Sequence, residues 1–194
     1  MIVHQRSYVN EILRRGNMGD AKAVGSPGIP GVVLSKSMQP QSGKDQDVMK
    51  NRPYANLTGA LIYLVSCTRP DMAYSTSQLA KFMADPGQAH WNAVQRALKY
   101  LVGTADLGVK YSKWKSMDVK LTIYCDADFA ADVDSRRSQS GIIVMINEQP
   151  VHWISKRQSM VALATCEAEL MAITDACREA FTLDIYWKKW VPSK

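Results

Sequence analysis

The chain has 194 residues, is 46% hydrophobic and carries a formal net charge of +6 at pH 7. This length and this hydrophobic content are enough to bury a core in one domain or in two small ones. The mild basic excess is compatible with a nucleic-acid partner but is also common in other soluble proteins. The longest apolar run, residues 59–65, is too short to cross a bilayer, and the N-terminus lacks the apolar core of a signal peptide. The sequence therefore predicts an intracellular protein without a membrane span.

Neither the cysteines nor the histidines form a recognisable site. The cysteines have no Cys-x-x-Cys spacing and no paired histidines nearby, which argues against zinc. They fall inside apolar helix or strand patterns, where we expect buried free thiols. The histidines are scattered, so a Cys–His or Ser–His catalytic pair has no support. The residues concerned are Cys67, Cys125, Cys166, Cys177, His4, His90 and His152.

The N-terminal part predicts a small folded element followed by a connection. Residues 1–23 predict a short strand and an amphipathic helix that ends at Gly16. Residues 24–52 hold Gly, Pro, Ser and Gln with few large apolar side chains. Such a composition buries too little surface to offset the entropy of ordering, so we expect a flexible linker or an extended arm.

Residues 53–107 predict an all-helical unit. Pro53 stands where a helix favours its first residue, and apolar residues recur after it at helical spacing. Residues 68–71 end this helix and begin a second one. A third helix, at about residues 90–102, is followed by Gly103, which supplies a C-terminal stop.

From Gly108 the hydrophobic period changes from helical to strand-like. Segments rich in Val, Ile and Tyr are followed by a helical pattern at 164–190, and residues 147–150 form a tight hairpin. The strand segments are 108–112, 119–129, 140–147 and 151–156. The sequence therefore predicts an α+β chain in which an N-terminal helical segment precedes a β-β-β-α unit.

Two acidic clusters are the main candidates for chemistry. Asp126 and Asp128 close the strand at 119–129, and Glu169 lies in the first turns of the last helix. A carboxylate on a strand that faces one on a helix can bind Mg²⁺ for phosphodiester cleavage. Strand residues two apart share a face, so Asp126 and Asp128 could bind one ion together. The alternative, which we favour for Asp128, is that it opens the turn that follows.

Glu169 shares a helical face with residues that would pack on a sheet, namely Cys166, Ala172, Ile173 and Ala176. Glu167 points about 200° away, toward solvent. A carboxylate on the packed face requires a partner. That partner is either a metal or substrate, or a basic side chain from the set Arg136, Arg137 and Lys156.

A third carboxylate for the same ion is difficult to find. Asp175 is six residues after Glu169, about 240° around the helix, and points away from it. Asp184 is on a similar face but ~22 Å further along the axis at 1.5 Å per residue. Neither residue can join Glu169 on one ion.

These residues resemble the ribonuclease H region of Ty1/copia-type retrotransposon polyproteins. The matching motifs occur in the family's order: YCDADFA at 124–130, RRSQSG at 136–141, WISKRQ at 153–158 and TCEAELMA at 165–172. Upstream, YANLTGALIYL at 54–64, TRPDMAY at 68–74 and the segment 90–108 resemble the thumb and connection that precede this nuclease. The resemblance implies that Asp126 matches the first catalytic aspartate and Glu169 the catalytic glutamate.

The same resemblance divides the chain into segments. It implies that residues 1–23 are the end of a polymerase region and that residues 53–107 are the helical connection, with the linker 24–52 between them. Residues 108–194 would then be a ribonuclease H-like domain. The family's later acidic residues, and the strand and helix that complete its sheet, have no counterpart here.

These departures predict a truncated ribonuclease H-like unit with half of its site. The polymerase motif Tyr-x-Asp-Asp is also missing, because one residue separates Asp126 from Asp128. We therefore expect no polymerase activity and no efficient nuclease activity, and we expect Mg²⁺ only if the ancestral site still functions. The unfinished sheet would expose a strand edge and apolar helix surface, which favours self-association.

The chain also resembles copia-like members of the secreted RxLR effector class of plant-pathogenic oomycetes. That resemblance implies a protein that is secreted, acts on an unknown host protein in the nucleus or cytoplasm, and suppresses plant cell death. The residues give it little independent support, since residues 12–15 read Ile-Leu-Arg-Arg and not Arg-x-Leu-Arg.

Two clusters combine lysine with tryptophan, as nucleic-acid grooves do. They are Lys113-Trp114-Lys115 and Lys188-Lys189-Trp190. They favour residual binding to RNA/DNA hybrids. The alternative, which we favour, is that Trp187 and Trp190 pack on a core or a partner, because they are three residues apart on one helix.

Overall fold

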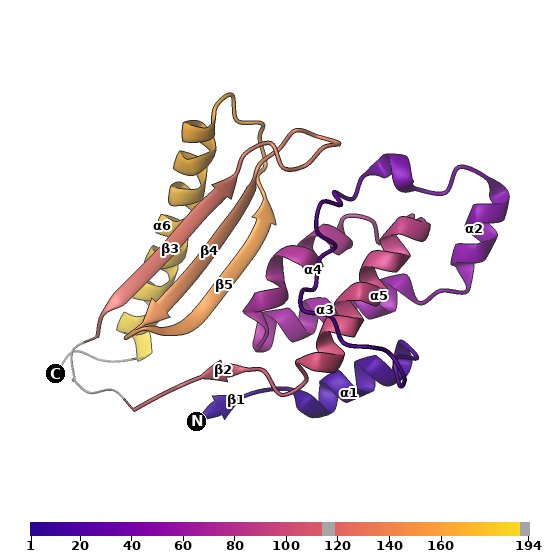
Figure 1. Cartoon of the computed structure of the whole chain (residues 1–194). Coiled ribbons are helices and arrows are strands. Elements are labelled where there is room, and N and C mark those ends of the chain that lie inside the picture. Colours follow the sequence, from indigo (N-terminus) through magenta and orange to yellow (C-terminus); the bar gives the residue numbers. More distant parts are fainter. Residues whose placement is uncertain (114–118, 191–194) are drawn as a thin grey trace. The chain divides into compact units, whose positions relative to one another are not determined.

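The computed structural model describes residues 1–113 and 119–190, except for the side chains of Tyr186, Trp187, Lys188 and Trp190 (Figure 1). The chain divides into two compact units, Met1–Tyr111 and Ser112–Lys194. Helices and sheets both occur, which confirms the α+β class. In the described part of the chain, none of the helices combines the length and the apolar character that crossing a bilayer requires.

The first unit is helical and contains one small two-stranded sheet. Its strand β2 pairs antiparallel with β1, so the strand predicted at 108–112 lies in this unit and not beside the later strands. The close approach of Gly108 to the Val3 carbonyl leaves no room for a Cβ atom. The elements are β1 (Ile2–Val3), α1 (Arg6–Arg15), η1 (Lys36–Met38), α2 (Gly43–Lys50), α3 (Tyr54–Cys67), η2 (Pro70–Met72), α4 (Ala73–Ala80), α5 (Gln88–Gly103) and β2 (Val109–Lys110).

Large apolar side chains from α1, α3 and α5 form the core of this unit. Ile12, Leu61 and Leu98 are fully buried in it. Tyr54 lies at the start of α3, and its hydroxyl donates to the Leu79 carbonyl at 2.8 Å. Burial raises the pKa of Tyr54, because the phenolate would lose its hydration. The helical periodicity of residues 53–107 thus gave the correct buried face.

Arg69 lies in the turn between α3 and α4 and connects this turn by hydrogen bonds to the C-terminal end of α5. It is 1% exposed, and its guanidinium donates to the Asp71 carboxylate, with the Arg69 Nη2–Asp71 Oδ2 distance being 2.8 Å. The same guanidinium donates to the Thr104 carbonyl and hydroxyl at 2.9 and 2.7 Å. A buried charge with all these partners is satisfied, so the turn at residues 68–71 is rigidly attached.

The segment predicted as a linker, residues 24–52, is more ordered than its composition suggests. Helix α2 begins at a capping box in which Ser42 and Asp45 satisfy each other's backbone amides. Leu34 and Met49 are buried, and the His90 imidazole lies 3.1 Å from the Ser35 carbonyl. A few apolar anchors and one buried imidazole therefore hold a segment that has no hydrophobic periodicity.

The second unit is a three-stranded antiparallel sheet with one long helix. The sheet order is β3-β4-β5. A two-residue turn joins β4 to β5, with positive φ at both Asn147 and Glu148, which is the turn geometry that fits the twist of a hairpin. The bounds are β3 (Leu121–Asp128), β4 (Gln139–Ile146), β5 (Gln149–Arg157) and α6 (Thr165–Trp190). The order β-β-β-α is as predicted, and its ribonuclease H-like character stays a prediction.

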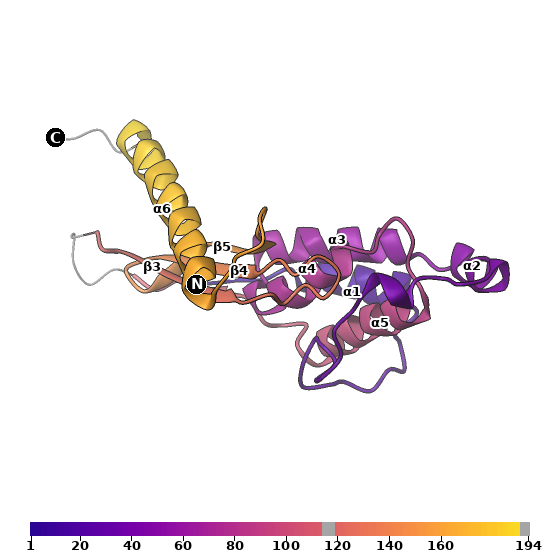
Figure 2. The ribbon, with the colours of Figure 1, turned by 90° about the horizontal axis from the view of Figure 1, so that it is seen from above.

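Helix α6 covers one face of this sheet (Figure 2). Alternate strand residues reach it, among them Ile123, Cys125, Ile142, Val144 and Ile154. The helix presents a stripe of small residues to the sheet, Ala168, Ala172 and Ala176, which are 5% exposed or less. Small side chains let the helix backbone approach the strands closely. The packed face is therefore centred on this alanine stripe.

The prediction that the cysteines are buried was wrong. Cys67, Cys166 and Cys177 are exposed, and Cys125 is half-buried, although all four are free thiols. Ile173, which we expected on the packed face of the last helix, is 46% exposed. Cys166, Ile173 and Cys177 are exposed because the alanine stripe occupies the positions of α6 next to the sheet.

Candidate functional site

The predicted metal ligands Asp126 and Asp128 lie in the last three residues of β3. Asp126 pairs with Gly141 and Asp128 with Gln139 in the register with β4. Both aspartates are exposed. Because strand residues alternate and Cys125 faces α6, Asp126 and Asp128 share the opposite face of the sheet. Asp128 is the final residue of the strand, so it both shares that face and leads into the turn at 129–130.

Glu169 reaches the edge of β3. Its Oε1 atom accepts a hydrogen bond from the Ala127 amide at 3.4 Å. The Asn147 amide donates to the Lys120 carbonyl at 2.9 Å, so even-numbered residues of β3 bond to β4 and odd-numbered ones turn their backbone groups away. In the described sheet β3 is an edge strand. Glu169 therefore satisfies an amide on the open edge of β3.

Asp126 and Glu169 approach the same stretch of backbone from two directions. Asp126 projects from the sheet face, and Glu169 comes from α6 to the amide of the next residue. Burial raises the pKa of the Cys125 thiol, and the nearby negative charges of Glu169, Cys177 and Asp126 raise it further. The structure thus places both predicted carboxylates beside residues 125–127 of β3, with Asp126 on the face away from α6 and Glu169 at the open edge of the strand.

No third carboxylate joins this pair in the part of the chain that the structure describes. There, no group of three His, Cys, Asp or Glu residues is arranged to hold a metal ion. Asp175 lies instead against β5, with its Oδ2 atom 3.1 Å from Lys156 Nζ. Mg²⁺ takes one or two protein carboxylates only when substrate oxygens and water complete its shell. The assignment of Asp126, Asp128 and Glu169 as metal ligands stays a prediction.

One of the basic residues proposed as a partner of Glu169, Lys156, is engaged elsewhere. Lys156 binds Asp175 on the β5 side of the unit. Among the described residues, the recorded partner of the Glu169 carboxylate is the Ala127 amide and not a basic side chain. Glu167, which we expected in solvent, is half-buried and accepts a hydrogen bond from the Leu163 amide at 2.5 Å. It caps the start of α6, which is a common role for a glutamate in the first turn.

The loop between β3 and β4 depends on a buried aspartate that the sequence reasoning missed. Asp132 is 4% exposed, and its Oδ1 atom accepts from the Asp134 and Ser135 amides at 3.1 and 2.9 Å. Its Oδ2 atom accepts from Arg157 at 2.9 Å. An aspartate that bonds backbone two and three residues ahead is a usual turn device, so Asp-x-Asp-Ser was the sequence feature that could have revealed it.

Gln158 joins the sheet to the helix beside the carboxylates. Its side-chain amide donates to the Ser140 hydroxyl at 3.0 Å and to the Ala168 carbonyl at 2.9 Å. Its own backbone amide donates to the Ser138 carbonyl at 2.8 Å. Ala168 is next to Glu169 in α6, so Gln158 fixes the height at which Glu169 meets β3. The WISKRQ motif therefore contributes a positioning residue as well as a strand.

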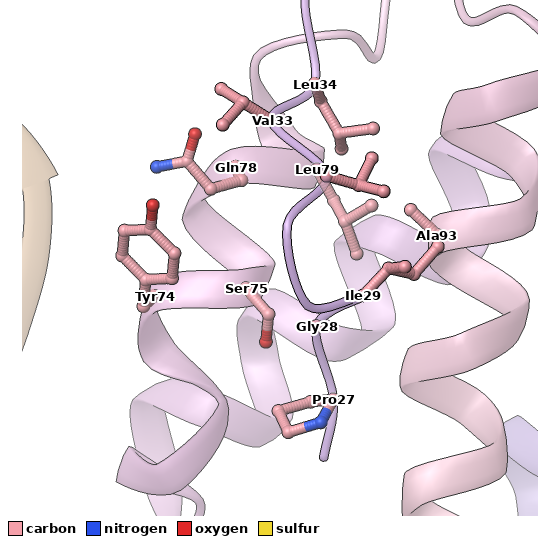
Figure 3. A pocket seen from close by; sticks show the side chains of 11 residues that line it. Pro27, Gly28, Ile29, Val33, Leu34, Tyr74, Ser75, Gln78, Leu79 and Ala93 are labelled. Carbon is pink, nitrogen blue, oxygen red and sulfur yellow. The ribbon is translucent and has the colours of Figure 1, made fainter. Parts of the chain in front are cut away.

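The first unit contains a pocket between residues 27–34 and helices α4 and α5 (Figure 3). Leu34, Leu79, Ile29 and Ala93 gather on one side of it, and Tyr74 and Gln78 lie at its rim. Its volume is about 100 Å³. Small-molecule sites usually enclose ~300–1,000 Å³, so this pocket has room for a side chain but not for a cofactor.

The lysine–tryptophan clusters fall largely outside the described residues. Trp114 and Lys115 lie outside them, as do the side chains of Lys188 and Trp190. Lys113 and Lys189 are described and exposed. The nucleic-acid interpretation of these clusters therefore stays a prediction.

Several known proteins resemble most of this chain. A tobacco (Nicotiana tabacum) protein, the retrovirus-related Pol polyprotein from transposon TNT 1-94, is 37% identical over 92% of the chain, which spans 13% of that protein. The Pol polyprotein from transposon RE2 of Arabidopsis thaliana is 35% identical over 90% of the chain, which spans 11% of that protein. The chain therefore matches a small part of each polyprotein.

A much shorter relative is matched along nearly its whole length. The secreted RxLR effector protein 161 of Plasmopara viticola is 43% identical over 71% of this chain, and the match spans 95% of that protein. No family model and no solved structure matches the chain.

Proposed function

Because the chain belongs to the Ty1/copia-type family of retrotransposon Pol sequences, we propose that it is a non-catalytic protein derived from the ribonuclease H end of Pol. The observation that carries this proposal is the isolation of the Asp126–Glu169 pair. Both carboxylates lie near the end of β3, and no third ligand joins them among the described residues.

The chemistry of phosphodiester cleavage explains why a pair is insufficient. Cleavage of this type needs metal ions clamped on both the attacking and the leaving oxygen, and several carboxylates normally hold them. Here Glu169 already accepts the Ala127 amide, and Asp126 projects from the sheet face. A metal ion could therefore use at most the second oxygen of Glu169 together with Asp126 and Asp128, which is fewer carboxylates than such sites normally provide.

A cleavage assay on an end-labelled RNA/DNA hybrid with Mg²⁺ or Mn²⁺ tests this proposal. We expect the same background cleavage from the 194-residue chain and from the double variant Asp126→Asn/Glu169→Gln. Cleavage by the chain that the double variant lacks, while circular dichroism shows both proteins folded, would overturn the proposal.

We further propose that this protein serves as an effector in plant cells. The support is the match to an oomycete protein named as a secreted RxLR effector, which the chain covers almost completely. In this role the protein is secreted, acts in the nucleus or cytoplasm of the host and suppresses cell death through contact with a host protein. A binding role of this kind needs a folded surface and no catalytic site.

Transient expression in leaves together with a cell-death elicitor tests the effector role. The chain should reduce cell death, and Asp126→Asn and Glu169→Gln should reduce it equally well because the carboxylates have no catalytic part. Unchanged cell death in the presence of the folded chain contradicts the effector role. Loss of suppression in either folded variant contradicts its non-catalytic nature.

Residual binding to RNA/DNA hybrids is a second candidate function, supported by the net charge of +6 and by the exposed Arg136 in the loop between β3 and β4. Arg136 has a positive φ of 57° and follows the Asp132 turn, so its backbone is held in place. Contacts with phosphates release counterions, and the affinity should therefore fall by orders of magnitude between about 50 and 200 mM salt. An affinity that ignores salt in this range excludes the phosphate-based mode.

A further inference from the structure

Among the described residues of the second unit, the outer face of α6 is apolar and exposed. Cys177 is nine residues after Ala168, so at about 100° per residue it points directly away from that sheet-facing alanine and about 140° away from Ala172. The large residues near this direction are exposed: Leu170 by 58%, Phe181 by 70% and Ile185 by 66%. Together with Ile173 and Cys177 they form what we call the outer stripe, defined as Leu170, Ile173, Cys177, Phe181 and Ile185.

A stripe of this kind is unusual on a surface helix. Such helices normally present charged and polar residues to water on the side away from the core. The outer stripe extends over 16 residues, or ~22 Å of helix at 1.5 Å per step, and it has helical spacing throughout. Contiguous apolar surface of this extent generally marks a place where another molecule binds.

The charges along α6 indicate what that molecule is. Its first half, residues 165–177, contains three acidic residues and no basic ones, whereas residues 178–190 contain three basic and two acidic ones. Glu167 is at one end beside the outer stripe, and the exposed Lys189 is at the other. A second α6 that runs in the opposite direction places each acidic end beside a basic one. Antiparallel helices also bring opposite ends of their dipoles together.

We infer that the outer stripe is a self-association surface, in which α6 packs antiparallel against α6 of a second copy about a two-fold axis near Cys177. In this register Ile173 of one copy faces Phe181 of the other. Leu170 faces the segment around Ile185, and Glu167 comes near Lys189. One patch that pairs with itself is the usual form of a symmetric dimer interface. The inference concerns how α6 packs against a second copy and involves no chemistry at Asp126 or Glu169, so it does not depend on the proposed function.

The mass of the full chain in solution, measured by sedimentation over a range of concentrations, is the first test. The wild type should form dimers. Ile173→Glu should raise the dimer dissociation constant by about tenfold or more, because it places a charge inside the contact. Val133→Glu is the matched control, since Val133 is in the same unit and is also 46% exposed, and it should leave the dimer unchanged. A wild type that stays monomeric, or equal weakening by both variants, overturns the inference.

Thiol cross-linking tests the direction of the helices. Diamide accepts two electrons and two protons from a pair of thiols and so joins cysteines that lie close together. The antiparallel arrangement puts Cys177 near its own counterpart and separates the two Cys166 residues. We therefore expect a disulfide-linked dimer that Cys177→Ser abolishes and Cys166→Ser does not. In parallel helices both Cys166 and Cys177 would meet their counterparts, so a covalent dimer that survives Cys177→Ser and is lost only in the double variant with Cys166→Ser would overturn the proposed arrangement.

Discussion

The two units of this protein bury their apolar surface in opposite ways. In the first unit, large side chains such as Leu57, Leu61 and Leu98 point inward from several helices and surround one another. In the second unit, α6 turns its alanines to the sheet and leaves Leu170 and Phe181 in solvent. The number of apolar residues in a segment is therefore a poor guide to the stability of its core. Only apolar side chains that point inward stabilise the fold, whereas those that point outward form a surface on which another molecule can bind.

The two cores should respond differently to truncation. Leu61→Ala in the first unit should lower the free energy of unfolding by about 4 kcal/mol, since the surrounding helices cannot close the cavity. Ile142→Ala in the second unit should cost about 2 kcal/mol, because in the described part of this unit a single helix, α6, covers it and can move inward. Hydrogen exchange followed separately in residues 1–111 and 119–190 checks this. Equal costs in the two units would remove the contrast.

Gln158 provides a sharper test of the second unit, because it replaces missing apolar contacts with hydrogen bonds between sheet and helix. Gln158→Leu should destabilise this unit by about 2 kcal/mol, since the Ala168 carbonyl and the Ser140 hydroxyl lose their donor. Gln149→Leu is the control and should cost far less, because the Gln149 side chain makes one solvent-exposed hydrogen bond, to the Ser112 carbonyl. The measurement is denaturant unfolding followed by hydrogen exchange in α6. A neutral Gln158→Leu variant would show that apolar packing alone positions α6.

The stability of the two units should also depend differently on alkaline pH. Burial raises the pKa of Tyr54, so the folded first unit holds this proton more tightly than the unfolded chain does. Its contribution is fully present below the unfolded tyrosine pKa of about 10 and is lost as pH rises above that value. Tyr54→Phe should cost about 1 kcal/mol at pH 7 through the lost bond to Leu79, and it should flatten the decline above pH 10. An unchanged alkaline decline in the variant contradicts this assignment.

The smallest expected effect concerns the hairpin turn of the second unit. Glu148 has a φ of 64°, a region that glycine adopts without strain. Glu148→Gly should raise the stability of the second unit by about 0.5 kcal/mol, because Asn-Gly is the preferred pair for this turn. The midpoint of thermal unfolding measures the gain. A loss of stability would mean that the Glu148 side chain makes a contribution larger than its backbone strain.

Much of the secondary structure could be predicted from local patterns. Pro53 and Gly16 bound helices as expected, and the Asn147 turn closed the hairpin. Helix α2 was missed because it has a capping box without apolar periodicity. The predicted strand at 108–112 formed, but its partner is β1, more than a hundred residues earlier. Local spacing does not contain that information, since strand pairing depends on long-range contacts.

The sequence by itself identified Asp126 and Glu169 as the candidate carboxylates. It also predicted that Asp175 points away from Glu169, because strand alternation and helical rotation are fixed by backbone geometry. It also determined the family through motifs that extend over both units. Only the tertiary structure decided that Glu169 bonds the Ala127 amide and that Asp132 is the buried acid of the loop. The tertiary structure also decided which of the two apolar faces of α6 packs against the sheet. The physical reason is that two helix faces of similar hydrophobicity compete for the sheet, and the one with smaller side chains packs closer.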